Sequence, residues 1–149
     1  MNLRILIPTL ILAIAIAGCA APSAAPAAAP VAPAAAQEAP AIDLASLPVD
    51  VDVATAAKLR ESPDVVILDV REQSEWDEVH IPGATLIPMG DIPARIKEIP
   101  TDKTVIVQCR SGNRSSQVTD YLRQQGMTNV HNLTGGMNEW EAAGLPVER

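Results

Sequence analysis

Aromatic side chains are nearly absent from this 149-residue sequence, which contains Trp76, Trp140 and Tyr121 but no Phe. The apolar interior must therefore be built largely from Val, Ile, Leu and Ala. Cysteine is scarce as well, because only Cys19 and Cys109 are present, and they lie in very different contexts. We expect no disulfide framework, and two histidines with a single domain cysteine do not form a metal-binding cluster.

The sequence also lacks an extended basic region. Its net charge is −7, and the basic residues are dispersed except for Arg110 and Arg114 near Cys109. Nucleic acids and anionic membrane surfaces attract basic patches, so neither is an expected partner of the domain. One positive loop in an acidic protein indicates a small anion drawn to a single point.

Residues 1–18 are typical of a bacterial lipoprotein signal peptide. Arg4 precedes an apolar run that is too short to span a bilayer comfortably and that ends in small residues. The run Ile16-Ala17-Gly18-Cys19 resembles the lipobox, which predicts cleavage before Cys19 and lipid on its sulfur. The expected product is a membrane-anchored, extracytoplasmic protein of the cell envelope or periplasm. An ordinary signal peptide or an uncleaved anchor would make Cys19 incidental.

Residues 19–46 are rich in Ala and Pro and offer no periodic apolar face. Recurrent proline prevents a continuous helix, so we expect a disordered, semi-rigid tether that supplies reach. The folded domain is expected over residues 47–149.

In that domain, short apolar runs alternate with segments of helical periodicity, and no tight hairpin is indicated. This order predicts one α/β domain whose parallel sheet is covered on both faces. The expected strands are 49–51, 65–68, 84–87, 104–108 and 128–133, and the expected helices are 52–60, 72–78, 91–98, 116–125 and 137–143.

The segment Cys109-Arg110-Ser111-Gly112-Asn113-Arg114-Ser115 links a buried strand to a helix. Open α/β sheets bind ligands at this position, where backbone N–H groups and the helix dipole favour negative charge. Two arginines add full charges, so the loop favours a thiolate, which is the nucleophilic form of cysteine. A buried structural cysteine is the simpler alternative.

Several motifs around this loop resemble those of the single-domain rhodaneses. They are Asp69-Val70-Arg71-Glu72, Glu75-Trp76, His80-Ile81-Pro82-Gly83-Ala84, the cysteine loop itself and Gly135-Gly136-Met137-Asn138-Glu139-Trp140. The resemblance covers residues 51–147, with one departure at Val79, where the family usually has glycine. It implies a five-stranded parallel sheet with flanking helices and sulfurtransferase activity, for which we expect no cofactor.

The resemblance also implies roles for the loop. Cys109 would accept a sulfane sulfur from thiosulfate or a similar anion as a persulfide and pass it to a thiol or to cyanide. Arg110 would attract the donor, and Arg114 would hold the loop. The implied substrate-binding residues are Arg110, Ser111, Gly112, Asn113, Arg114 and Ser115.

Three other functions compete with this interpretation. Cysteine phosphatases and arsenate reductases place five residues between cysteine and arginine, whereas four separate Cys109 from Arg114. A Cys–His hydrolase would need His80 or His131 as a base, and neither has a marked partner. A non-catalytic sulfur carrier or sensor remains open.

We expect the domain to act as a monomer.

Two further residues are expected to support the site. Asp69 ends a strand beside the cleft and is expected to orient the loop. Arg71 and Glu75 stand four apart, which favours a local ion pair at a helix start. Gly135 and Gly136 are expected simply to allow a turn.

Overall fold

The computed structural model describes residues 42–149. The predicted signal peptide, the lipid attachment at Cys19 and most of the predicted tether lie outside this range. In residues 42–149, no helix is long and apolar enough to cross a membrane.

Five strands form one wholly parallel sheet in the order β1-β5-β4-β2-β3. This arrangement confirms the predicted α/β class. The strands are β1 (Asp50–Val51), β2 (Val65–Asp69), β3 (Thr85–Leu86), β4 (Thr104–Gln108) and β5 (Val130–Leu133). The central strand, β4, is a β-branched run with four of its five residues buried, as expected for a strand covered on both faces.

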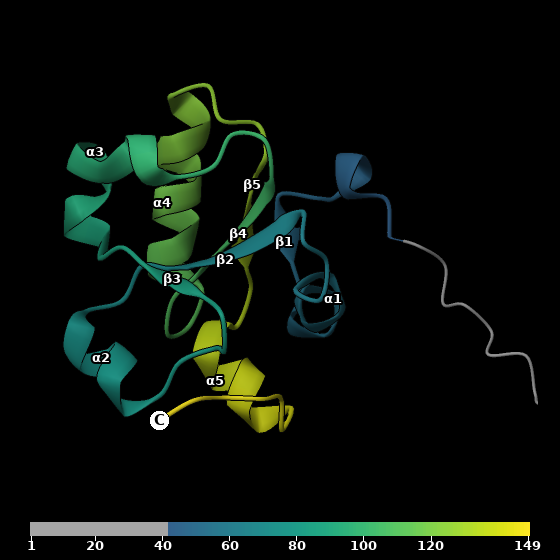
Figure 1. Cartoon of the computed structure of the whole chain (residues 1–149), viewed down its shortest axis with the longest axis vertical. Helices are drawn as coiled ribbons and strands as arrows, with labels where there is room; N and C mark the ends of the chain where they lie inside the picture. Colours follow the sequence, from purple (N-terminus) through teal and green to yellow (C-terminus); the bar gives the residue numbers. More distant parts are fainter. Residues whose placement is uncertain (1–41) are drawn as a thin grey trace, which may run out of the picture. The chain divides into compact units, whose positions relative to one another are not determined.

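Helices cover both faces of this sheet (Figure 1). They are α1 (Val53–Leu59), α2 (Gln73–Glu78), α3 (Ile92–Arg95), α4 (Asn113–Gln124) and α5 (Gly136–Ala142). Alternate residues of β4 belong to separate cores: Val105 and Val107 pack with α3 and α4, and Ile106 packs with α1 and α5. Trp140 fills the second core and is fully buried, so the scarce aromatic residue is used where it removes most surface from water.

The start of α4 differs from the sequence-based prediction. The helix begins at Asn113, three residues before the predicted 116, because Gly112 adopts a left-handed φ of 93° at the cap. A residue without a side chain can adopt this conformation at low cost. The shift places Arg114 and Ser115 in the first helical turn, directly beside the cysteine loop.

The predicted helix over 91–98 is divided in the structure. Ile92–Arg95 is α-helical and Ile96–Glu98 is a 3-10 turn. The packing of the domain also starts slightly before residue 47. Leu44–Ser46 forms a 3-10 turn capped by Asp43, and Leu44 packs against the core on the α1 side.

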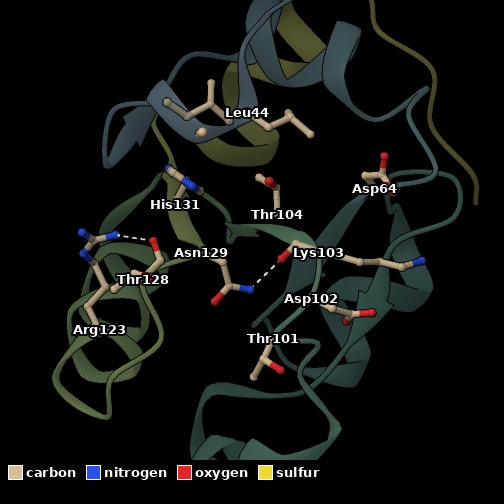
Figure 2. A pocket seen from close by; sticks show the side chains of 12 residues that line it. Leu44, Asp64, Thr101, Asp102, Lys103, Thr104, Arg123, Thr128, Asn129 and His131 are labelled. Atoms are coloured by element: carbon tan, nitrogen blue, oxygen red, sulfur yellow. Dashed lines mark hydrogen bonds between the residues drawn. The ribbon is translucent and has the colours of Figure 1, made fainter.

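A polar pocket of about 520 Å³ lies at the amino ends of β2, β4 and β5 (Figure 2). Its side chains tie loops together: Asn129 Nδ2 donates to the carbonyl of Lys103 at 2.6 Å, and Arg123 donates to that of Thr128 at 3.2 Å. Cys109 follows the carboxyl end of β4, so this pocket is at the opposite end of the sheet from the cysteine loop.

Candidate active site

The thiol of Cys109 is buried immediately after β4, where the residue is 1% exposed. Its Sγ accepts a hydrogen bond from the backbone N–H of Gly112 at 3.2 Å. The hydroxyl oxygen of Ser115 is also within reach of Sγ, at 3.4 Å. Both donors come from the chain that follows the cysteine, so the loop folds back around its own sulfur.

These surroundings lower the pKa of Cys109 below its ordinary value. Burial acts in the opposite direction and raises the pKa, because it disfavours the charged thiolate. The hydroxyl of Ser115 and the backbone N–H groups of Ser115, Ser111 and Gly112 outweigh burial by hydrogen bonding to the thiolate. The site therefore stabilises the nucleophilic form of the cysteine mainly through local hydrogen-bond donors.

The amino end of α5 fixes the shape of the loop. The N–H groups of Met137 and Asn138 donate to the carbonyls of Cys109 and Arg110 at 2.9 and 3.0 Å. Those carbonyls are thereby turned towards α5, which leaves the N–H groups of the following residues free to face the sulfur. A Cβ at Gly136 would lie 2.3 Å from the carbonyl oxygen of Cys109, so only glycine permits this approach.

The guanidinium of Arg114 forms an ion pair with the carboxylate of Glu75. Its two terminal nitrogens each donate to a different oxygen of the Glu75 carboxylate, both at 2.7 Å. Hydrogen bonding from Arg114 lowers the pKa of Glu75 to about 2, so the pair stays charged at neutral pH. This contact connects α2 to the first turn of α4, and it supports the prediction that Arg114 holds the loop.

The expected pairing of Arg71 with the Glu75 carboxylate is wrong. The guanidinium of Arg71 is buried and binds both carboxylate oxygens of Asp69, with Nη2 at 2.7 Å from Oδ2. Its other nitrogen contacts are the backbone carbonyls of Glu75 and Val79, at 3.2 and 2.7 Å. Asp69 and Arg71 therefore form a buried frame under α2, with no direct hydrogen bond to Cys109.

Val79, the one departure from the rhodanese motifs, causes no strain. Its backbone is extended, with φ −165° and ψ 138°, a conformation open to any residue. Its carbonyl still accepts from Arg71. The backbone at this position therefore does not require glycine.

The remaining loop side chains point outward. Arg110, Ser111 and Asn113 are exposed, whereas Gly112 and Ser115 are buried. Arg110 makes no ion pair with any residue from 42 to 149. It lines a small pocket of about 150 Å³ together with Glu78, Asn138 and Glu141 among others. A free guanidinium at the rim of the loop suits an incoming anion.

Neither histidine is placed to serve Cys109 as a base. His80 stacks on Trp76 at a centroid separation of 4.0 Å, and its Nε2 lies 3.2 Å from a Glu148 carboxylate oxygen. His131 Nδ1 is 2.7 Å from the carbonyl of Pro48. In the part of the chain that the structure describes, no three His, Cys, Asp or Glu residues are grouped to hold a metal ion.

Three contributors to the site were not identified from the sequence. Glu75 was assigned the wrong partner, and Gly136 was expected only to allow a turn. Asn132, whose Oδ1 lies 2.7 Å from Ser115 Oγ, was not considered. Of these three residues, only Gly136 is marked in the sequence, by the adjacent glycines Gly135 and Gly136. The contacts of Glu75 and Asn132 join residues that are far apart in the chain, so no local pattern indicates them.

Comparison with known proteins identifies the family of this chain. The model of the rhodanese-like domain matches residues 52–143, and the chain belongs to this family. A sulfurtransferase from Allochromatium vinosum is 44% identical over 90 residues, covering 60% of this chain and 84% of the relative. The thiosulfate sulfurtransferase GlpE of Pseudoalteromonas translucida is 32% identical over 93 residues, covering 62% and 89%. A rhodanese-related protein from Thermoplasma volcanium has a TM-score of 0.63 at 29% identity, covering 66% of this chain and 96% of that one.

The role of Gly136 can be tested with Gly136→Ala and, as a matched control, Gly144→Ala. Both glycines have positive φ, 55° and 66°, but a Cβ at Gly144 would meet nothing within 4 Å. In each variant the alanine must adopt a left-handed backbone conformation, which lowers the stability of the fold by about 1 kcal/mol. Only Gly136→Ala also displaces the Cys109 carbonyl, so its alkylation at Cys109 should slow about tenfold, the effect of losing one hydrogen bond to a charged group.

The measurement is the rate of iodoacetamide labelling of the Cys109 peptide, with folding checked by thermal unfolding. A folded Gly136→Ala protein that labels as fast as Gly144→Ala would show that α5 does not shape the thiol site.

Proposed function

We propose that this chain is a sulfurtransferase that carries a sulfane sulfur as a persulfide on Cys109. The observation that carries the proposal is a buried thiol of lowered pKa, surrounded by hydrogen-bond donors of its own loop. The membership of the chain in the rhodanese-like family and its similarity to named sulfurtransferases support this chemistry.

In the first half-reaction, the Cys109 thiolate attacks the outer sulfur of thiosulfate or a similar donor. A bond forms between Sγ and that sulfur, the sulfur–sulfur bond of the donor breaks, and its electron pair leaves with sulfite. No proton moves, so no general base is needed once the thiolate has formed. Arg110, exposed and free of ion pairs within residues 42–149, is the group that would attract the donor anion and stabilise departing sulfite.

In the second half-reaction, a thiolate or cyanide attacks the terminal sulfur of the persulfide. The bond to Sγ breaks, and its electron pair returns to Cys109 as the thiolate. Hydrogen bonds from Gly112 and Ser115 to Sγ stabilise this leaving group. The hydrogen bonds from Gly112 and Ser115 therefore stabilise Cys109 both as the attacking thiolate and as the leaving group.

The structure gives one argument against phosphatase or arsenate reductase chemistry. Such a reaction needs the loop arginine to bind a tetrahedral oxyanion, yet both terminal nitrogens of Arg114 donate to Glu75. The shorter loop, with four residues between Cys109 and Arg114, makes a smaller cradle that suits a single sulfur atom better.

A non-catalytic carrier or sensor is the second candidate, and the burial of Cys109 favours it. A thiol that is only 1% exposed admits a small donor more readily than a bulky acceptor. The two candidates differ in whether the persulfide, once formed, is discharged.

Treatment of the full chain with thiosulfate should add one sulfur atom to the peptide that contains Cys109. Peptide mass spectrometry locates the adduct, and subsequent cyanide should remove it and release thiocyanate. Cys109→Ser should abolish both steps. An adduct that cyanide does not discharge would indicate a carrier, whereas no adduct, or aryl phosphate turnover matching that of thiosulfate, would contradict the proposal.

We also propose a location for the protein, from the sequence before residue 42. The lipobox-like run ending at Cys19 supports a lipid anchor, with the folded domain outside the cytoplasm. Metabolic labelling with a radioactive fatty acid in a bacterial host should mark the wild-type chain and place it in the membrane fraction. Cys19→Ala should lose both label and membrane association, and a wild-type chain without label would refute the anchor.

A further inference from the structure

Four side chains form a continuous row that ends at the reactive sulfur, one from the cysteine loop and one each from α4, β5 and β1. Cys109 Sγ lies 3.4 Å from Ser115 Oγ, which lies 2.7 Å from Asn132 Oδ1. Asn132 Nδ2 donates in turn to Asp50 Oδ1 at 2.8 Å. The sheet order β1-β5-β4 produces the row, because Asp50 and Asn132 are direct partners across neighbouring strands.

The orientation of the Asn132 amide is determined by Asp50. A carboxylate only accepts hydrogen bonds, so the nitrogen of Asn132 must face Asp50 and its oxygen must face Ser115. That oxygen needs a donor, and Ser115 is the residue within reach. Asn132 and Ser115 are 5% and 0% exposed, so water does not readily replace either partner.

Ser115 has a single hydroxyl proton but three acceptors around it. They are Asn132 Oδ1 at 2.7 Å, the Gly112 carbonyl at 3.0 Å and Cys109 Sγ at 3.4 Å. One proton cannot serve all three at once. Asn132 has the shortest contact, so the hydroxyl points to Asn132 while Cys109 is a neutral thiol.

We propose that Asn132, oriented by Asp50, competes with Cys109 for the hydroxyl proton of Ser115, and that Ser115 is a two-position donor. When the sulfur becomes negative, the hydroxyl turns from Asn132 to Sγ and stabilises the thiolate. Whenever the Ser115 hydroxyl rotates to Sγ, Oδ1 of Asn132 loses its hydrogen-bond donor. Asn132 and Asp50 are thus positioning residues that act on the sulfur through Ser115.

This competition has a use in the proposed sulfur transfer, on which its functional meaning rests. A thiolate that is stabilised too strongly is a weaker nucleophile, although it leaves more easily. The competition from Asn132 limits stabilisation of the attacking thiolate. The same hydroxyl remains available when the persulfide bond breaks and negative charge returns to Sγ.

Other charged groups near the loop are not part of this row. They are expected to contribute equally in all the variants below, because none of them hydrogen-bonds to Ser115 or Asn132. They are Asp69 and Arg71 at the end of β2, Glu75 on α2, Arg110 in the loop, Arg114 on α4 and Glu139 on α5.

The test measures alkylation of the Cys109 peptide against pH in the full chain. Ser115→Ala removes the donor, so its labelling midpoint should move to higher pH. Asn132→Leu removes the competing acceptor, keeps the number and branching of the side-chain heavy atoms and releases the hydroxyl to the sulfur, so its midpoint should move to lower pH. Below the wild-type midpoint, Asn132→Leu should label roughly three- to tenfold faster, the effect of one strengthened hydrogen bond.

Variants of Asp50, an exposed residue of the edge strand β1, test the other end of the row. They provide a test of the proposal even if Asn132→Leu does not fold. Asp50→Ala frees the Asn132 amide to reverse and should also lower the midpoint. Asp50→Asn removes the same charge but can still accept from Asn132 Nδ2, so it should stay closer to wild type. Equal shifts in both variants would indicate simple charge repulsion and overturn the proposal.

The double variant Ser115→Ala/Asn132→Leu decides whether Asn132 acts through Ser115. It should have the midpoint of Ser115→Ala alone. A lower midpoint in the double variant, or an unchanged midpoint in Asn132→Leu, would refute the competition. These readouts do not involve sulfur transfer, so the expected shifts in a protein that forms no persulfide would uphold the row and refute only the proposed function.

Discussion

The whole site depends on the contact between the amino end of α5 and the cysteine loop. Two N–H groups of α5 hold the carbonyls of Cys109 and Arg110, and Gly136 allows the approach. With these carbonyls turned away, the N–H groups that follow can face the sulfur. Their hydrogen bonds lower the pKa of a thiol that burial alone would raise. The last helix of the chain therefore determines the chemistry of a loop that precedes it by more than twenty residues.

Around this contact, two ion pairs hold the surrounding elements in place. Asp69 and Arg71 are buried together at the end of β2, and Arg114 joins Glu75 of α2 to α4. Breaking a buried pair by removing one partner leaves an uncompensated charge, which is strongly destabilising. These charges therefore serve the frame of the site, which leaves Arg110 as the loop cation without an ion pair among residues 42–149.

Patterns local in the sequence predicted the fold well. The apolar run over β4 and the alternation of strands with helices indicated a covered parallel sheet, and the cysteine loop marked its reactive end. Contacts set by three-dimensional order could not be predicted in this way. Arg71 and Glu75 have the spacing of a helical ion pair, yet Asp69 binds Arg71 and Arg114 binds Glu75. Likewise, the row from Asp50 to Ser115 exists only because β1 and β5 are neighbours.

The central claim is that the hydrogen-bond donors of this loop lower the pKa of Cys109 without help from a general base. The most direct measurement is the pH dependence of alkylation at the Cys109 peptide in the wild-type full chain. Because the pKa is lowered, the thiolate should persist to lower pH, and the labelling midpoint should fall below that of an unfolded peptide of the same sequence. A midpoint equal to or above that of the unfolded peptide would contradict the account, since burial would then outweigh the donors of the loop.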